Sequence, residues 1–209
     1  MNTYRLLAIG GSAGAITALG LLLPAFHKGY PLPVVIAIHL HPQQDRYYLD
    51  HFSERCSLVV KEAEEKERIQ PGYIYFAPPN YHLLIEDNET FSLSIDAKVN
   101  YSRPSIDVLF ESAADAYGPE VIALSLTGAN NDGAAGMRRI KEKGGTALVQ
   151  DPQTAESPFM PKSVIEATPV DFILPLPEIR AFFEKIGKHR SVPSSAQNQP
   201  IRKGGSHDF

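Results

Sequence analysis

The run Pro33-Val34-Val35-Ile36-Ala37-Ile38 is apolar at every position and rich in β-branched residues. A strand with one face in water alternates polar and apolar residues, whereas a strand covered on both faces is apolar throughout. The runs Tyr4–Ile9 and Val121–Leu126 have nearly the same character. These three runs therefore predict buried parallel strands in the interior of a sheet that has helices on both faces.

Segments with a helical spacing of apolar residues separate the predicted strands. In segment 14–26, for example, Ile16, Leu19 and Leu23 fall on one helix face. This alternation is typical of a three-layer α/β/α fold with an open, mostly parallel sheet, as in Rossmann-like proteins. The predicted helices are 14–26, 44–56, 105–116, 132–143, 163–167 and 178–186; further strands are predicted at 57–60, 72–76, 146–150 and 171–174, and 83–85 pairs with 91–95 in a small β-hairpin insertion.

The bulk composition limits the class of protein and its compartment. The 209 residues suit one domain, which we expect over residues 1–188, while the Ser-, Pro-, Gln- and Gly-rich residues 189–209 are expected to be a disordered tail. A net charge of −4 gives no reason to expect nucleic acid as a partner. No apolar run approaches the roughly 20 residues that a membrane span needs. The single cysteine, Cys56, excludes an internal disulfide and fits a reducing cytosol.

Polar residues follow the three predicted interior strands, at the edge where open parallel sheets bind their ligands. Ser12 follows the first strand, His39 follows the second, and Asp132 follows the third after a glycine-containing turn. Serine, histidine and aspartate supply a hydroxyl nucleophile, a base with a pKa near neutrality and a carboxylate that orients this base. The order of the three along the chain carries no weight, because triads are defined by geometry. The pattern therefore indicates acyl transfer.

The glycines around Ser12 allow two other interpretations. The run Gly10-Gly11-Ser12-Ala13-Gly14 also fits an ordinary strand-to-helix turn, with Ser12 as the N-cap of the helix. Nucleotide binding is disfavoured, because the run lacks the G-x-G-x-x-G spacing and is not followed by Gly-Lys-Ser/Thr. A dinucleotide fold also expects an acidic residue after the second strand, where this chain has His39.

Residue types alone also do not decide which residues act with Ser12 as base and as orienting carboxylate. His41 and His82 are alternatives to His39 as the base, and most histidines near loops are ordinary surface residues. A metal site is disfavoured, because no Cys or Glu cluster accompanies the histidines. Asp132 also fits a helix cap in its Asn-Asp-Gly turn. Cys56 has no glycine turn beside it, so we expect a structural residue rather than a nucleophile.

Several separate motifs, in the same order along the chain, resemble the catalytic domain of CheB methylesterases. The similarity extends from about Leu6 to Leu176. The motifs are Ile9-Gly10-Gly11-Ser12-Ala13-Gly14, Ile38-His39, Lys61-Glu62-Ala63, the 72–82 segment with its Ala-Pro-Pro, Arg103-Pro104-Ser105-Ile106-Asp107-Val108-Leu109-Phe110, Leu126-Thr127-Gly128 with Asn131-Asp132-Gly133-Ala134-Ala135-Gly136-Met137, and Met160-Pro161.

The resemblance implies a role for each site residue. Ser12 is expected to be the nucleophile, His39 the general base in preference to His41, and Asp132 the residue that orients His39. Backbone amides near Ala13 and Ala129 are expected to hold the oxyanion. The implied reaction is hydrolysis of glutamate methyl esters on chemoreceptors in the cytoplasm, and in this family also deamidation of certain glutamines, with no cofactor and no metal.

The sequence also departs from the family pattern. Members usually carry an N-terminal receiver domain, whereas this chain starts at the first catalytic strand, so we expect a stand-alone catalytic domain. Ala13 stands where members commonly have Thr, and Ala129-Asn130 replaces the usual Met-Gly. Asparagine tolerates a positive φ, so this turn is expected to be kept. The departures favour, as an alternative, a catalytically weak homologue that acts as a regulatory or binding module in a sensory complex; an esterase or amidase with another substrate is a third possibility.

Overall fold

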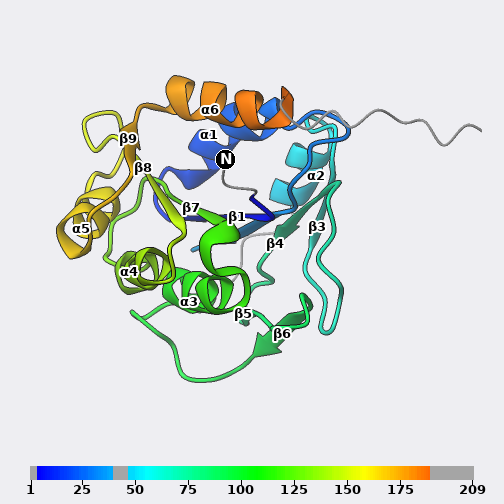
Figure 1. The fold of residues 1–209 in the computed structure, drawn as a ribbon, viewed down its shortest axis with the longest axis horizontal. Helices are drawn as coiled ribbons and strands as arrows, with labels where there is room; N and C mark the ends of the chain where they lie inside the picture. Colours follow the sequence, from blue (N-terminus) through cyan, green and yellow to red (C-terminus); the bar gives the residue numbers. More distant parts are fainter. Residues whose placement is uncertain (1–3, 40–46, 189–209) are drawn as a thin grey trace, which may run out of the picture.

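The computed structural model describes residues 4–39 and 47–188. Within these residues, a seven-stranded parallel sheet has the order β3-β4-β2-β1-β7-β8-β9, and β5 and β6 form a separate antiparallel hairpin (Figure 1). The predicted open parallel sheet with a small hairpin is confirmed. The strands are β1 (Leu6–Gly11), β2 (Val34–Ile38), β3 (Val59–Glu62), β4 (Tyr73–Phe76), β5 (His82–Ile85), β6 (Phe91–Ser94), β7 (Val121–Ser125), β8 (Thr146–Gln150) and β9 (Phe172–Leu174).

The strand order changes direction at β1. The chain adds β2, β4 and β3 on one side of β1 and then returns to place β7, β8 and β9 on the other side. Gly11 lies opposite Ile38 of β2, and Gly10 lies opposite Ser125 of β7, so the carboxyl ends of the three strands are nearly level. Ligands of open α/β sheets bind at such a switch point, and the three predicted site residues follow these three strands.

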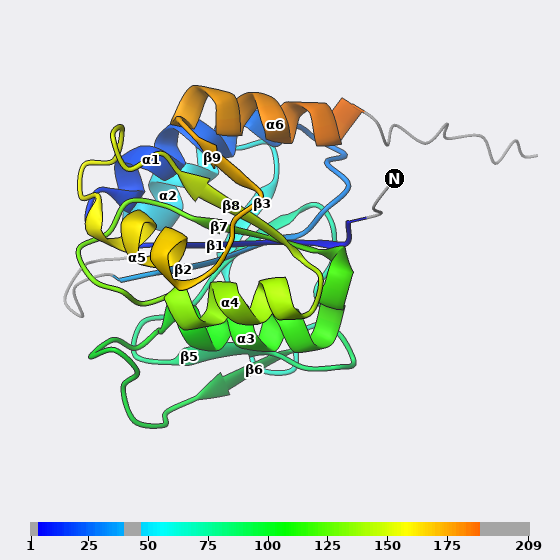
Figure 2. The same ribbon diagram turned by 60° about the vertical axis from the view of Figure 1, so that its left-hand side comes forward.

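Helices cover both faces of the sheet, as Figure 2 shows. Leu7 and Ile9 of β1 are buried in the core on the face of α1, α2 and α6, whereas Leu6 and Ala8 are buried in the core on the face of α3, α4 and α5. The continuous apolar runs of the sequence are thus explained by burial on both sides. The helices are α1 (Ala15–Leu22), α2 (Tyr47–Ser53), α3 (Ile106–Tyr117), α4 (Ala134–Glu142), α5 (Phe159–Ala167) and α6 (Leu176–Lys188).

Several helices differ in length from the prediction. The predicted helix 14–26 is an α-helix only to Leu22 and continues as a 3₁₀ turn, Leu23–Ala25. Pro24 accounts for the change, because it has no N–H to donate and its ring clashes with the preceding turn. The predicted helix 44–56 ends at Ser53, and residues 44–46 lie outside the described residues. The predicted tail, residues 189–209, also lies outside them.

The hairpin packs against the outer surface of α3. Leu83, Ile85 and Phe91 are buried in the core on this face of the sheet. The N–H of Ile85 also donates to the hydroxyl of Ser112 in α3, at 3.1 Å. The segment that leaves β6 then leads back to the N-terminus of α3, which lies at the site. None of the helices in residues 4–39 and 47–188 is long and apolar enough to cross a membrane.

Candidate active site

Ser12 lies at the turn between β1 and α1, at the carboxyl end of the sheet. Its N–H donates to the carbonyl of Thr127, at 2.9 Å, which fixes the turn to the segment after β7. Gly14 has φ 80° and is the N-cap of α1. This left-handed conformation is open to glycine at no steric cost. Ser12 is therefore not the helix cap, and its half-buried hydroxyl is available for other contacts.

Helix α3 approaches the end of β1 closely. A Cβ on Gly10 would lie 2.2 Å from Cγ2 of Ile106, a distance that real atoms do not reach. Glycine at this position therefore lets the first turn of α3 lie directly over the strand. The consequence for the site is that the free N–H groups of this turn lie within reach of residues that follow β7.

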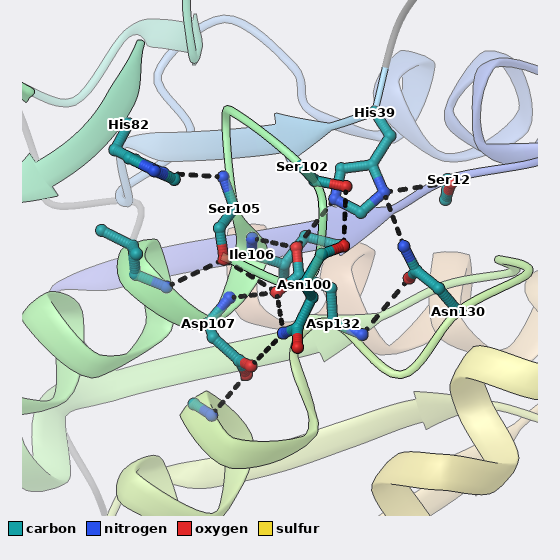
Figure 3. A network of polar contacts seen from close by, with 12 residues as sticks. Ser12, His39, His82, Asn100, Ser102, Ser105, Ile106, Asp107, Asn130 and Asp132 are labelled. Atoms are coloured by element: carbon teal, nitrogen blue, oxygen red, sulfur yellow. Dashed lines mark hydrogen bonds and ion pairs between the residues drawn. The ribbon is translucent and has the colours of Figure 1, made fainter. Parts of the chain in front are cut away.

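His39 lies between the other two predicted site residues (Figure 3). Its N–H donates to the carbonyl of Gly11, at 3.2 Å, as β2 ends. Nδ1 of its ring lies 3.2 Å from Oγ of Ser12, and Nε2 lies 2.7 Å from Oδ2 of Asp132. The imidazole is 13% exposed and the carboxylate is fully buried. The structure thus brings together three residues that are far apart in the sequence.

Asp132 does not cap its own helix. The N-cap of α4 is Gly133, with φ 95°. The carboxylate instead accepts hydrogen bonds at the N-terminus of α3, from the N–H of Ile106 at 2.7 Å and of Asp107 at 3.1 Å. Oγ of Ser105, the N-cap of α3, donates to it at 2.8 Å. A helix N-terminus favours negative charge, so this arrangement stabilises a buried carboxylate.

The balance of these contacts keeps Asp132 ionised. Burial alone would raise the pKa of Asp132, but the hydrogen bonds from His39, Asn100, the Ile106 N–H and Ser105 outweigh burial and lower it. An ionised carboxylate only accepts hydrogen bonds, so the proton shared with His39 belongs to Nε2. Nδ1 of neutral His39 then carries the lone pair that faces Ser12. In the serine protease triad the roles of the two ring nitrogens are reversed.

Asn130 makes two contacts at the site that residue types did not reveal. Its Nδ2 lies 3.4 Å from Nδ1 of His39, and its Oδ1 accepts from the N–H of Asp132 at 3.2 Å. The prediction that Asn130 keeps the turn by a positive φ is wrong. Asn130 is not among the non-glycine residues with a positive φ; Gly133 has this conformation instead. Asn130 therefore affects the site through its side chain and not through its backbone conformation.

Three further residues of the network were missed as site residues: Asn100, Ser105 and Asp107. Asn100 and Ser105 donate to Asp132, and Asp107 accepts from the side chain of Asn100. One signal was available in the sequence, because Pro104-Ser105 before an apolar helix is typical of an N-cap. No pattern indicated that another carboxylate would share this cap, since Asp132 lies 27 residues beyond Ser105.

The alternative candidates lie elsewhere. The buried ring of His82 accepts from the N–H of Ser105 at 3.2 Å and contacts the carbonyl of Ala97 at 3.0 Å, so it supports the N-terminus of α3. His41 lies outside the described residues. Burial raises the pKa of the Cys56 thiol to about 11, which leaves little thiolate at neutral pH. No group of three or more metal-ligating side chains occurs in the described part of the chain.

The two residues expected to supply the oxyanion amides, Ala13 and Ala129, lie in the turns that follow β1 and β7. Ala13 directly precedes Gly14, and its carbonyl accepts from Oγ1 of Thr127 at 2.9 Å. Ala129 follows Gly128, whose backbone is bound on both sides to the start of α5: its N–H donates to Ser157 and its carbonyl accepts from Met160. Both turns are thus held in place by hydrogen bonds to neighbouring segments.

Comparison with known proteins supplies the family. The family model described as CheB methylesterase matches residues 7–183, most of the chain. The chain belongs to the CheB methylesterase family. It is 49% identical over 186 residues to a protein of Leptospira interrogans that carries the provisional name protein-glutamate methylesterase/protein-glutamine glutaminase. This match covers 89% of the chain and 96% of that protein.

A relative from Thermotoga maritima, a protein-glutamate methylesterase/protein-glutamine glutaminase, is 34% identical over 174 residues. The match covers 82% of this chain and 51% of that protein. The crystal structure of the Thermotoga maritima CheB methylesterase catalytic domain superposes with a TM-score of 0.83 and 33% identity, over 88% of this chain and 99% of that one. The fold described above is therefore the fold of the CheB catalytic domain.

Proposed function

We propose that this chain is a protein-glutamate methylesterase that also deamidates glutamine side chains, with Ser12 as nucleophile, His39 as general base and Asp132 as the residue that orients His39. The observation that carries the proposal is the continuous contact from Ser12 Oγ through His39 to a fully buried, ionised Asp132. The names of the relatives with 49% and 34% identity support the choice of reaction.

In the first half of the reaction, Oγ of Ser12 attacks the side-chain carbonyl of a methylated glutamate. Nδ1 of His39 takes the hydroxyl proton, while Asp132 stabilises the imidazolium through Nε2–H. Charge develops on the carbonyl oxygen, and the N–H groups of Ala13 and Ala129 are the proposed donors to it. The tetrahedral intermediate then expels methanol, which receives its proton from His39. Glutamine reacts in the same way and releases ammonia.

In the second half, water hydrolyses the glutamyl ester on Ser12. His39 accepts a proton from the water as it attacks the acyl carbonyl, and the same amides stabilise the second oxyanion. The proton then returns from His39 to Oγ of Ser12 as the product carboxylate leaves. Each half uses His39 first as base and then as acid, and the charged Asp132 supports it in both.

The proposed substrates are the methylated glutamates of chemoreceptors on their cytoplasmic side, so the proposed compartment of the protein is the cytoplasm. Family membership supports chemoreceptors as the substrates, and the name of the 49% identical relative supports methylated glutamate in a protein. Ser12 lies half-buried at the carboxyl end of the sheet, where open α/β folds bind their ligands.

A second candidate is a weakly active homologue that serves as a regulatory or binding module. Asn130 supports it, because its amide approaches the same ring nitrogen of His39 that must accept the proton of Ser12. Ala13 supports it as well, since the hydroxyl that members commonly have after the nucleophile is absent. The two candidates differ in rate, so a rate measurement separates them.

The test is methanol release from a receptor fragment that carries methylated glutamates. We expect the full chain to release methanol with turnover, and to release ammonia from a fragment that carries glutamine at the same positions. The same fragment with unmodified glutamate is the blank. Stable binding of the methylated fragment without methanol release would support the regulatory module and contradict the enzyme.

A further inference from the structure

The side chain of Asn100 contacts two buried carboxylates at once. Its Nδ2 donates to Oδ1 of Asp132 at 3.0 Å and to Oδ2 of Asp107 at 2.8 Å. Asp132 is completely buried and Asp107 is 6% exposed. Figure 3 shows the Asn100 amide between the two carboxylates, on the side of Asp132 opposite to His39.

Asn100 comes from an irregular segment and not from the core. Residues 95–105 connect β6 to α3, and Tyr101, which follows Asn100, is 96% exposed. The backbone of Asn100 has φ 49°, and Val99 and Ser102 form an isolated antiparallel bridge around it. The carbonyl of Asn100 also accepts from Oγ of Ser102 at 3.4 Å. The backbone conformation is thus fixed so that one polar side chain points inward.

The second carboxylate orients this amide. Oδ1 of Asp107 accepts from the N–H of Gly136 in α4 at 2.7 Å, so Asp107 is itself held in place. Burial raises the pKa of Asp107, and the nearby charge of Asp132 acts in the same direction. The two carboxylates therefore disfavour each other's charge, and a donor between them reduces this cost. The side-chain amide of asparagine has two N–H donors, so Asn100 can donate one hydrogen bond to each carboxylate.

We propose that Asn100 is a positioning residue for the triad: its amide fixes the rotamer and the charge of Asp132, and thereby the tautomer and orientation of His39. The kinetic test of this inference rests on the proposed function, whereas the positioning of Asp132 does not. The amide of Asn100 binds Asp132 and Asp107 and not His39, so we expect it to act on the reaction through Asp132. Its loss is expected to lower kcat and to leave KM nearly unchanged.

Two variants separate the donor from the shape of the side chain. Asn100→Asp keeps the shape, tolerates the same backbone, and replaces the donor by a third carboxylate. Asn100→Gly removes the side chain and adopts φ 49° without strain. A role in packing alone predicts that Asn100→Gly lowers the free energy of unfolding and leaves kcat unchanged. The matched control is Asn88→Ala, in the hairpin turn, where the asparagine side chain contacts Thr90 and lies far from the triad.

We expect Asn100→Gly to lower kcat about tenfold and Asn100→Asp about a hundredfold, as for the loss of one charge-assisted hydrogen bond and for the addition of repulsion. KM is expected to change less than about twofold. Asn88→Ala is expected to retain the wild-type kcat and KM. If Asn100→Asp does not fold, the kcat and KM of Asn100→Gly alone test the kinetic prediction.

A second readout does not depend on activity. The proton on Nε2 of His39, hydrogen-bonded to Asp132, gives a far-downfield NMR signal, which we expect to shift in both Asn100 variants and not in Asn88→Ala. Folded variants with an unmoved signal would overturn the proposal, as would a changed KM with an unchanged kcat. A wild type that releases no methanol would contradict the proposed function, and the NMR arm would still decide the position of Asp132.

Discussion

The side-chain amide nitrogen of Asn130 lies 3.4 Å from Nδ1 of His39. Oγ of Ser12 approaches the same nitrogen at 3.2 Å, so two donors compete for one lone pair. The base of the proposed reaction is therefore partly occupied in the resting structure. The contact comes from Asn130, one of the positions at which the sequence departs from the pattern that the family resemblance leads us to expect.

Asn130→Gly is expected to raise kcat/KM by about twofold, because a weak hydrogen bond to the base is removed and the lone pair is left to Ser12. The rate of methanol release from a methylated receptor fragment measures the effect. Asn131→Gly, at the exposed neighbouring position, is the control and is expected to match the wild type. A large loss of activity in Asn130→Gly would show that Asn130 assists the reaction instead.

The buried carboxylate of Asp132 gives the fold a specific dependence on acid. Burial opposes its charge, but hydrogen bonds from His39, Asn100 and α3 lower its pKa below the ordinary 3.8. Such a group contributes stability that is present above its unfolded pKa and is lost as the pH falls through the lower, folded value. Asp107 acts in the opposite direction, because burial raises its pKa.

We therefore expect the free energy of unfolding to fall more steeply below about pH 4 in the wild type than in Asp132→Asn. Urea unfolding at a series of pH values from neutral to acid measures it. The wild type is also expected to be the more stable protein at neutral pH. In Asp132→Asn, the new amide NH₂ replaces one carboxylate oxygen, and its N–H donors face the N–H donors of α3. Parallel pH profiles for the two proteins would contradict a charged Asp132.

Thr127 connects the nucleophile turn to the start of α5. Its buried hydroxyl donates to the carbonyl of Ala13 at 2.9 Å and accepts from the N–H of Ser157 at 2.8 Å. Thr127→Val is expected to lower the free energy of unfolding by about 1–3 kcal/mol, because it leaves buried polar groups unpaired. Thr154→Val, at an exposed threonine, is the control, with an expected change within about 0.5 kcal/mol. Equal stability of the two variants would contradict this role.

Cys56 is expected to take no part in the chemistry. Since burial raises its thiol pKa to about 11, alkylation by iodoacetamide should be slow at neutral pH and should accelerate as the pH approaches that value. Cys56→Ser is expected to release methanol at the wild-type rate. Rapid alkylation at neutral pH together with loss of activity would identify Cys56 as a second reactive group.

The interior of the fold was predictable because burial on both faces leaves a direct mark on the sequence. The runs around Leu7, Val35 and Ala123 are apolar at nearly every position, and each is a central strand. The ends of helices were less predictable, because they depend on single residues such as Pro24. The order of the strands required the structure, since neighbouring strands are joined by segments of very different length.

At the site, residue types and strand ends identified Ser12, His39 and Asp132 as candidates, and the three are in contact in the structure. The surroundings of Asp132 were not predictable, because its donors come from residues 100 and 105–107, on a different helix and loop. Asn130 was interpreted by its backbone, whereas its side chain makes the contact with His39. Side-chain networks across loops leave no periodic signal in the sequence.

The nucleophilic role of Ser12 is central to the proposed function, and one comparison tests it most directly. Methanol release from a methylated receptor fragment is measured for the wild type and for Ser12→Ala, a substitution that removes only Oγ from a half-buried turn residue. We predict turnover in the wild type and a loss of about a thousandfold or more in Ser12→Ala. Equal rates in the two proteins would contradict this role.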